Sequence, residues 1–337
     1  MIQTFEMTKT LLMELHDGAV STTTDVWNML TASQDGDIER VKELAHRCPA
    51  LITCQYDYTS PLHLAVREGH LDLVRYLVGQ GALDPAYKTH PFMDSLVTVA
   101  DDRGYDEIAQ FLKQSLSDPR LTREWGDTGK IDYGKDETRR RFQELVDKNK
   151  HADVEAMLQE RPELARDELA FWGEGILSMP AKDGDRQMLE LLMRYGARVP
   201  DHSKWAQEYY FKNYESAVFL MENGMNPNHM NWRRVTLLHD MAYKGAIRKA
   251  RLLLDHGADI NAVDEEYRST PLGFASRWGQ REMVAFLLER GADANESGAQ
   301  WATPRAWAEK MGHDAILALL PGVAPNAAKK EPSSSRK

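Results

Sequence analysis

Cysteine is nearly absent from this sequence, and so are the long apolar runs of membrane proteins. The 337 residues include two cysteines, Cys48 and Cys54, which are too few for a disulfide framework and have no metal-ligand spacing around them. No apolar run approaches the roughly 20 residues that span a bilayer. Residues 1–16 carry charges among their apolar positions and lack the unbroken core of a signal peptide. We therefore expect a cytoplasmic protein with two free thiols and no membrane contact.

The sequence also lacks the short motifs of catalysis and cofactor binding. It contains no glycine-rich phosphate loop after a strand, no His-Glu-x-x-His, no Cys-x-x-Cys and no Gly-x-Ser-x-Gly elbow. Gly173-Glu174-Gly175 is an isolated glycine cluster, which we interpret as a finger loop between helices. The formal net charge of -10 disfavours nucleic acid as a partner and leaves room for a basic protein. These absences favour a non-catalytic protein without a cofactor or metal.

The sequence does contain an internal repeat. Three clear copies begin at Ser269-Thr270-Pro271-Leu272, Ser60-Pro61-Leu62-His63 and Thr236-Leu237-Leu238-His239, and each ends in Gly-Ala. A glycine in the middle of the unit recurs every 33 to 35 residues where neighbouring units are intact. These glycines are Gly36, Gly69, Gly104, Gly184, Gly245, Gly279 and Gly312. A period of about 33 residues indicates a solenoid of stacked helix pairs.

These motifs resemble the ankyrin repeat, with its Thr-Pro-Leu-His start, its central glycine and its Gly-Ala-Asp close. The resemblance covers roughly residues 25–320 and implies an all-α solenoid of about nine helix-turn-helix units with short β-hairpin fingers. The fourth and sixth units are degenerate, with Asn149 and Lys212 near the positions where the glycine is expected. In the family the histidine of the opening motif bonds to backbone between units, which implies structural roles for His63 and His239.

Local chemistry explains the other signature residues. Thr270 is expected to cap the first helix of its unit, and Pro271 to occupy the first turn, where an N–H would have no helical partner. Gly69 and Gly279 are expected to allow a left-handed helix end and a tight turn.

The domain organisation follows from the register. We expect an N-terminal capping helix at 1–24, three units at 25–116, an inserted loop at 117–136, six units at 137–322 and a disordered tail at 323–337. The loop contains Pro119, Gly126, Gly129 and Gly134, and it either bends the stack or simply connects two parts of it.

Large aromatic residues gather at positions that the register directs toward the concave face of the last five units. Six rings occupy such positions: Tyr210, Phe211, Tyr243, Phe274, Trp278 and Trp307. Neighbouring fingers and helices add Trp232, Arg233, Asp240, Lys244, Tyr267, Arg277 and Trp301. Exposed aromatic patches mark binding sites, and Tyr, Trp and Arg dominate interface hot spots. The alternative is that degenerate units turn their rings into the core, which applies most strongly to Tyr210 and Phe211.

Two functions fit this predicted groove. The first is a scaffold or adaptor that captures another protein or peptide on the aromatic face; a bacterial adaptor and an immunity protein that masks a toxin are concrete versions. The second is a small-molecule site or an enzyme, in which Asp240 and Tyr243 act as an acid/base pair and burial raises the pKa of Asp240. A deep pocket at these residues would favour the second function, and an open groove the first.

Overall fold

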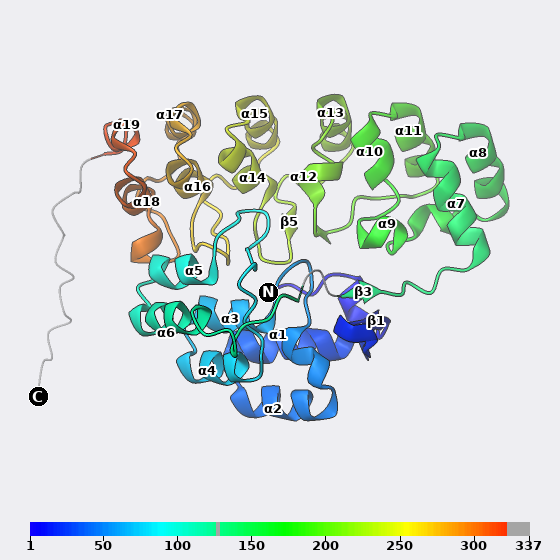
Figure 1. Cartoon of the computed structure of the whole chain (residues 1–337). Coiled ribbons are helices and arrows are strands. Elements are labelled where there is room, and N and C mark those ends of the chain that lie inside the picture. The colour runs from blue at the N-terminus through cyan, green and yellow to red at the C-terminus, as the bar shows by residue number, and fades with distance from the viewer. Residues whose placement is uncertain (126–128, 322–337) are drawn as a thin grey trace, which may run out of the picture.

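The computed structural model describes residues 1–125 and 129–321, and helices dominate it (Figure 1). Nine helix pairs follow one another within these residues, as the repeat predicted. The expected disordered tail lies outside the described residues. The chain forms two stacks, which we call the N-terminal stack (α1–α6) and the C-terminal stack (α7–α19), and the inserted loop joins them.

The N-terminal stack contains three units. Its pairs are α1 (Thr23–Asp35) with α2 (Ile38–Arg47), α3 (Pro61–Glu68) with α4 (Leu71–Gly79), and α5 (Leu96–Asp102) with α6 (Asp106–Leu116).

The C-terminal stack contains six units. Its pairs are α7 (Glu137–Asp147) with α8 (His151–Glu160), α10 (Ser178–Asp183) with α11 (Arg186–Arg194), α12 (Ala206–Tyr209) with α13 (Tyr214–Glu222), α14 (Leu237–Lys244) with α15 (Ile247–Asp255), α16 (Pro271–Arg277) with α17 (Arg281–Glu289), and α18 (Pro304–Met311) with α19 (Asp314–Leu317). A short helix, α9 (Ala170–Gly173), precedes α10. In Figure 1 the C-terminal stack curves into an arc, and the first helix of each pair lies in its inner row. The N-terminal stack lies against that inner side.

The repeat signature acts locally as its chemistry predicted. The Thr270 side chain accepts the N–H of Gly273, and Pro271 opens α16. Gly69 ends α3 in the left-handed region at φ 85°. His239 lies 3.0 Å from the backbone oxygen of Ser269 in the next unit, so the role implied for this histidine is confirmed.

His63 departs from the family pattern. Its Nε2 lies 3.0 Å from a carboxylate oxygen of Glu266, and its Nδ1 lies 2.9 Å from the Tyr87 hydroxyl. The histidine is structural, but its Nε2 partner belongs to the other stack, so the expected contact with backbone between units is wrong here.

Residues 1–24 do not form the expected capping helix. Their 3-10 turns span Glu6–Thr8 and His16–Gly18, and their strands are β1 (Leu12–Glu14) and β2 (Val20–Thr22). β1 pairs antiparallel with β2 and with β3 (Lys130–Ile131), a strand from the inserted loop. Burial alternates along β1, with Leu12 exposed and Met13 buried, and this period of two suits a strand. The segment therefore ties the loop to the N-terminal stack.

The fingers are short turns with little strand structure. β4 (His202–Ser203) pairs in parallel with β5 (Met230–Asn231), so two neighbouring fingers are joined to each other. Within the second finger, an isolated antiparallel bridge joins Met230 to Thr236.

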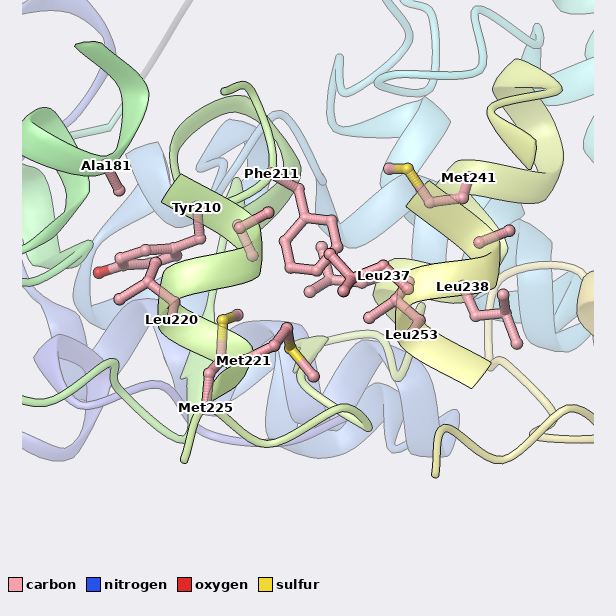
Figure 2. Close-up of a cluster of buried hydrophobic side chains, with 14 of the residues drawn as sticks. Ala181, Tyr210, Phe211, Leu220, Met221, Met225, Leu237, Leu238, Met241 and Leu253 are labelled. Atoms are coloured by element: carbon pink, nitrogen blue, oxygen red, sulfur yellow. The ribbon is translucent and has the colours of Figure 1, made fainter. Parts of the chain in front are cut away.

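The sixth unit buries its rings in the core. Its first helix, α12, ends at Tyr209, so Tyr210 and Phe211 lie in the turn after it, where the groove-facing register no longer applies. Both rings are fully buried. Figure 2 shows them among apolar side chains of α13 and α14. For these two residues the alternative of rings turned into the core is correct.

Candidate functional site

The concave face of the C-terminal stack is covered by the chain itself. The predicted binding residues that the structure buries are Tyr210, Phe211, Trp232, Arg233, Tyr267, Phe274, Arg277 and Trp307. Those that keep part of their surface are Asp240, Tyr243, Lys244, Trp278 and Trp301. The expectation of an open aromatic groove is therefore wrong. Its physical reason is that the N-terminal stack packs against the inner row of helices and covers it (Figure 1). We call this contact the seam.

Phe92 of the N-terminal stack fills the aromatic groove. Its ring centroid lies 5.4 Å from that of Tyr243, 5.0 Å from Tyr267, 5.5 Å from Phe274 and 5.1 Å from Trp278. Phe92 belongs to the apolar core of the C-terminal stack. The rings that we expected to hold a partner thus hold a side chain of the same protein.

Trp232 makes the reciprocal contact. This finger residue of the C-terminal stack belongs to the apolar core of the N-terminal stack. Its ring lies 6.1 Å from Trp27 and 5.2 Å from Tyr56, and its Nε1–H donates to the Asp57 carboxylate at 2.8 Å. Each stack therefore places one large ring in the core of the other.

A buried carboxylate, Glu266, lies at the centre of the seam. Its oxygens lie 3.0 Å from His63, 3.4 Å from Arg233 and 3.6 Å from Arg67, and its side chain is 1% exposed. Burial by itself would raise the pKa of Glu266, but these basic groups outweigh burial and hold the pKa well below its ordinary value. The carboxylate is ionised at neutral pH and pairs cations from both stacks.

A second charged cluster closes the seam at α16. Arg277 lies 2.7 Å from Asp94 and 2.8 Å from Asp102, both of the N-terminal stack. Lys310 lies 2.6 Å from Asp102, and the Tyr267 hydroxyl donates to Asp94 at 2.6 Å. Asp102, Arg277 and Lys310 all occupy groove-facing positions of their units, so the concave faces of the two stacks meet each other.

We expect Tyr267→Phe to lower the free energy of unfolding by about 1.5–3 kcal/mol, the usual contribution of a buried hydrogen bond to a charged group. The ring packing stays, and Asp94 loses a donor. Urea unfolding at pH 7 measures the difference. Tyr195→Phe, outside the seam, is the matched control and should stay within about 0.5 kcal/mol of wild type. Equal losses in the two variants would show that the Tyr267 hydroxyl contributes nothing.

A cavity of about 770 Å³ lies at one end of the seam. It is open to solvent on one side and is lined by the N-terminal segment, the first finger, residues 129–135 and the fingers of the fifth and sixth units. Its lining residues are Glu14, Leu15, Tyr56, Asp57, Tyr58, Gly129, Lys130, Ile131, Tyr133, Lys135, Trp172, Glu174, Lys204, Trp205 and Tyr209. The volume falls within the range of small-ligand sites, about 300–1,000 Å³.

Two of the carboxylates that line this cavity each keep a buried oxygen without a hydrogen-bond partner in the described residues. Glu174, which is 1% exposed, accepts the backbone N–H groups of Lys204 and Trp205 at Oε1, both at 3.1 Å. Asp57 accepts Trp232 Nε1–H at Oδ2. Within residues 1–125 and 129–321, Glu174 Oε2 and Asp57 Oδ1 are buried without a hydrogen-bond partner. Such orphaned acceptors are costly and are typical of functional sites.

Burial shifts the pKa values of both acids upward. Desolvation raises the pKa of Glu174 to about 8, against the attraction of Lys204. Desolvation also raises the pKa of Asp57, although Arg233 opposes it. Lys204 is paired with Glu6 at 2.9 Å. The cavity therefore holds an acid that titrates near neutral pH, a common property of binding and catalytic sites.

The backbone around the cavity is strained. Asp57 and Tyr58 have φ angles of 50° and 60°, and Phe171 and Trp172 have φ angles of 46° and 63°. Non-glycine residues seldom adopt these values, and strain of this kind clusters at functional sites. Hydrogen bonds hold the strained turns: the Tyr87 hydroxyl donates to the Tyr58 carbonyl at 2.9 Å, and Lys204 donates to the Trp172 carbonyl at 2.6 Å.

Two rings at the cavity remain open to solvent. The Trp172 side chain is 58% exposed and Tyr58 is 42% exposed. Trp205 lies beside Tyr58, with its ring 5.9 Å from that of Tyr58 and 4.3 Å from His90. We call Tyr58, Trp172 and Trp205 the rim. Large exposed aromatic residues on a strained, well-anchored backbone are suited to contact a partner.

Sequence reasoning missed this site. Asp240 does have a pKa raised to about 7 by burial, but it is not part of the cavity lining. The glycine cluster around Glu174 was the available signal, because Gly173 and Gly175 both adopt positive φ angles that place this carboxylate. In the described part of the chain, no group of three His, Cys, Asp or Glu residues is arranged to hold a metal ion, and no helix has the length and apolarity to cross a membrane.

Comparison with known proteins identifies the same repeat in this chain. A family model of ankyrin repeats in three copies matches residues 28–128 and 205–298, more than half of the chain. The Arf-GAP with coiled-coil, ANK repeat and PH domain-containing protein 2 of Oryctolagus cuniculus is 33% identical over 107 residues, which are 32% of this chain and 13% of that protein. Palmitoyltransferase Hip14 of Drosophila melanogaster is 36% identical over 77 residues, 23% of this chain and 12% of that protein.

The chain spans less than a fifth of the length of these relatives. Residues 129–204 lie between the two ranges that the family model matches, and they supply Tyr133, Trp172, Glu174 and Lys204 to the cavity. The cavity is thus built largely from chain that departs from the repeat pattern. The helix pairs, their glycine spacing and the matched ranges together show that this protein belongs to the ankyrin-repeat family.

Proposed function

We propose that this protein is a binding scaffold that captures a partner protein at the rim of the cavity. Ankyrin repeats bind other proteins, generally through the concave face that stacked units create. Here that face is closed by Phe92 and the charges of the seam, so a partner needs another surface. The observation that carries the proposal is the pair of exposed rings, Trp172 and Tyr58, beside a cavity with orphaned acceptors. Aromatic anchors beside a pocket are the usual centre of an interface.

The proposal extends to the kind of scaffold, its location and its secondary contacts. A bacterial adaptor and a toxin-immunity protein both remain versions of it, since each requires a protein partner. A cytoplasmic location is also proposed, because Cys48 and Cys54 are free thiols. Asp240, Tyr243, Lys244, Trp278 and Trp301 remain proposed as secondary contacts, since each keeps some exposed surface.

A small-molecule site is the second candidate. The volume of the cavity and the raised pKa of Glu174 favour it. Asp240 and Tyr243 are no longer the natural acid/base pair for such a site, because Tyr243 packs on Phe92 in the seam.

Trp172→Ala tests the proposed scaffold. We expect capture of the partner from native lysate to fall by about 30-fold in affinity, which corresponds to a hot-spot loss of about 2 kcal/mol. Because the ring is largely exposed, the free energy of unfolding should change by no more than about 0.5 kcal/mol. Quantitative mass spectrometry of the retained proteins measures capture.

Met311→Ala is the matched control, since Met311 is 46% exposed and lies away from the cavity. A protein retained by wild type and Met311→Ala but lost by Trp172→Ala supports the rim. Equal retention by all three chains contradicts it.

A further inference from the structure

We infer that the cavity receives a protonated nitrogen group that carries N–H donors, the ammonium or guanidinium head of a Lys or Arg side chain from the partner. This inference rests on the proposed function and names the chemistry that the partner must offer.

The first argument is the charge of the cavity. Lys204 is paired with Glu6 at 2.9 Å, and Lys135 donates to Gln143 at 3.0 Å. Two of the three lysines that line the cavity are thus already engaged, and the third is Lys130. Glu174 and Asp57 each keep one buried oxygen without a partner in the described residues. A ligand that pairs with the ionised forms of these two acids must be positively charged.

The second argument is hydrogen bonding. Glu174 Oε2 and Asp57 Oδ1 are acceptors, and an ionised carboxylate can only accept. An ammonium offers three N–H donors and a guanidinium offers five, so either head has enough donors for both oxygens. A quaternary ammonium has the charge without the donors, and an anion would be repelled.

The third argument is the wall of aromatic rings. Six rings line the cavity: Tyr56, Tyr58, Tyr133, Trp172, Trp205 and Tyr209. Two of them already face cations of the chain, since Lys204 Nζ lies 5.7 Å from the Tyr56 ring and Lys135 Nζ lies 5.0 Å from the Tyr133 ring. Aromatic faces attract cations, and they also cover the methylene stem of a long side chain.

Binding of a cation is coupled to a proton on Glu174. The charged and titratable groups that act on Glu174 are Lys204, Asp57, Glu6, Tyr133, Tyr209 and Tyr210. With its pKa at about 8 in the free protein, Glu174 is mostly protonated at pH 6.5 and must ionise when the cation binds. Binding therefore releases a proton, and affinity rises with pH up to about 8.

The test uses the full chain and small probes. Saturation-transfer NMR and calorimetry measure binding of n-butylammonium, n-propylguanidinium, 1-butanol and tetramethylammonium at pH 8. We expect the first two to bind at least about tenfold more tightly than the last two, since only they supply charged N–H donors. A lowering of the pH from 8 to 6.5 should weaken n-butylammonium by about tenfold or more.

Three variants locate the probe. Glu174→Gln and Asp57→Asn keep the acceptors for the backbone and Trp232, and asparagine tolerates the φ of 50° at residue 57. Each should weaken n-butylammonium by at least about tenfold. Glu289→Gln, an exposed residue of α17, should leave binding unchanged, and circular dichroism verifies the fold of each variant.

The peptides Ac-Gly-Lys-Gly-NH2 and Ac-Gly-norleucine-Gly-NH2 separate a side chain from a free amine. Tighter binding of the lysine peptide supports a partner side chain. If n-butylammonium binds and the lysine peptide does not, the ligand is a free amine and not a side chain of a partner protein. Equal binding of 1-butanol and n-butylammonium overturns the cationic chemistry but leaves the cavity as a binding site. If no probe binds, the inference fails, while the Trp172→Ala capture still decides the proposed function separately.

Discussion

Glu266→Gln is expected to lower the free energy of unfolding by about 3–5 kcal/mol, the usual loss when one member of a buried ion pair is removed. The substitution keeps the size of the side chain and removes its charge. Arg67 and Arg233, whose side chains are 1% and 2% exposed, then share a buried site without the carboxylate that joins them. Because those arginines come from different stacks, the loss falls on the seam.

Urea unfolding at pH 7, followed by circular dichroism and tryptophan fluorescence, measures this change. The two signals should separate in Glu266→Gln, since the stacks lose part of what couples them. Glu289→Gln is the matched control and should stay within about 0.5 kcal/mol of wild type. A loss below about 1 kcal/mol in Glu266→Gln, the value of an exposed pair, would falsify a seam held by buried charge.

Glu174→Gln is expected to stabilise the protein relative to wild type, by an amount that grows with pH. The folded pKa of Glu174 is raised from an ordinary 4.5 to about 8, so the folded state holds a proton that the unfolded state releases. The contribution of Glu174 to the free energy of unfolding is therefore fully present below about pH 4.5. It is lost as the pH rises toward 8, by about 5 kcal/mol in total. Glutamine at residue 174 has no proton to lose, and it still accepts the backbone N–H groups.

Unfolding free energies of both chains at pH 4.5, 6, 7 and 8 give the difference directly. It should be small at pH 4.5 and largest at pH 8. The same series with Glu289→Gln should show a difference that does not change with pH. If the difference in unfolding free energy between Glu174→Gln and wild type does not change with pH, the carboxylate is solvated in the folded protein. Its burial then costs no stability that a ligand could restore.

The two predictions connect stability to function. The charges of the seam are paired, so they hold the stacks together. Glu174 and Asp57 each keep a buried oxygen without a hydrogen-bond partner in the described residues, so these two acids cost stability. Natural proteins keep costs of this kind mainly at sites that they use. This contrast between Glu266 and Glu174 supports the proposal that a partner binds at the cavity and not in the aromatic groove.

The repeat could be read from sequence because its contacts are local. Thr270, Gly69 and His239 act within a unit or on the next one, so a spacing of about 33 residues carries the information. The prediction of a capping helix at residues 1–24 was wrong because the contacts of this segment are not local. Its apolar residues were read with a helical period, whereas pairing of β1 with a strand more than 100 residues away favoured a period of two.

The sequence by itself determined that this protein is a stack of helix pairs, which residues cap them and which side chains the register directs inward. Only the tertiary structure decided what those side chains contact. The Phe92 ring packs against Trp278, and His63 pairs with Glu266. These residues lie too far apart in the sequence for the repeat spacing to predict their contacts. The cavity arises in the same way, because Asp57 and Glu174 line it together only when the two stacks pack against each other. Repeat periodicity specifies contacts between adjacent units, whereas the packing of one stack on the other brings distant units together and turns a predicted open groove into a closed seam.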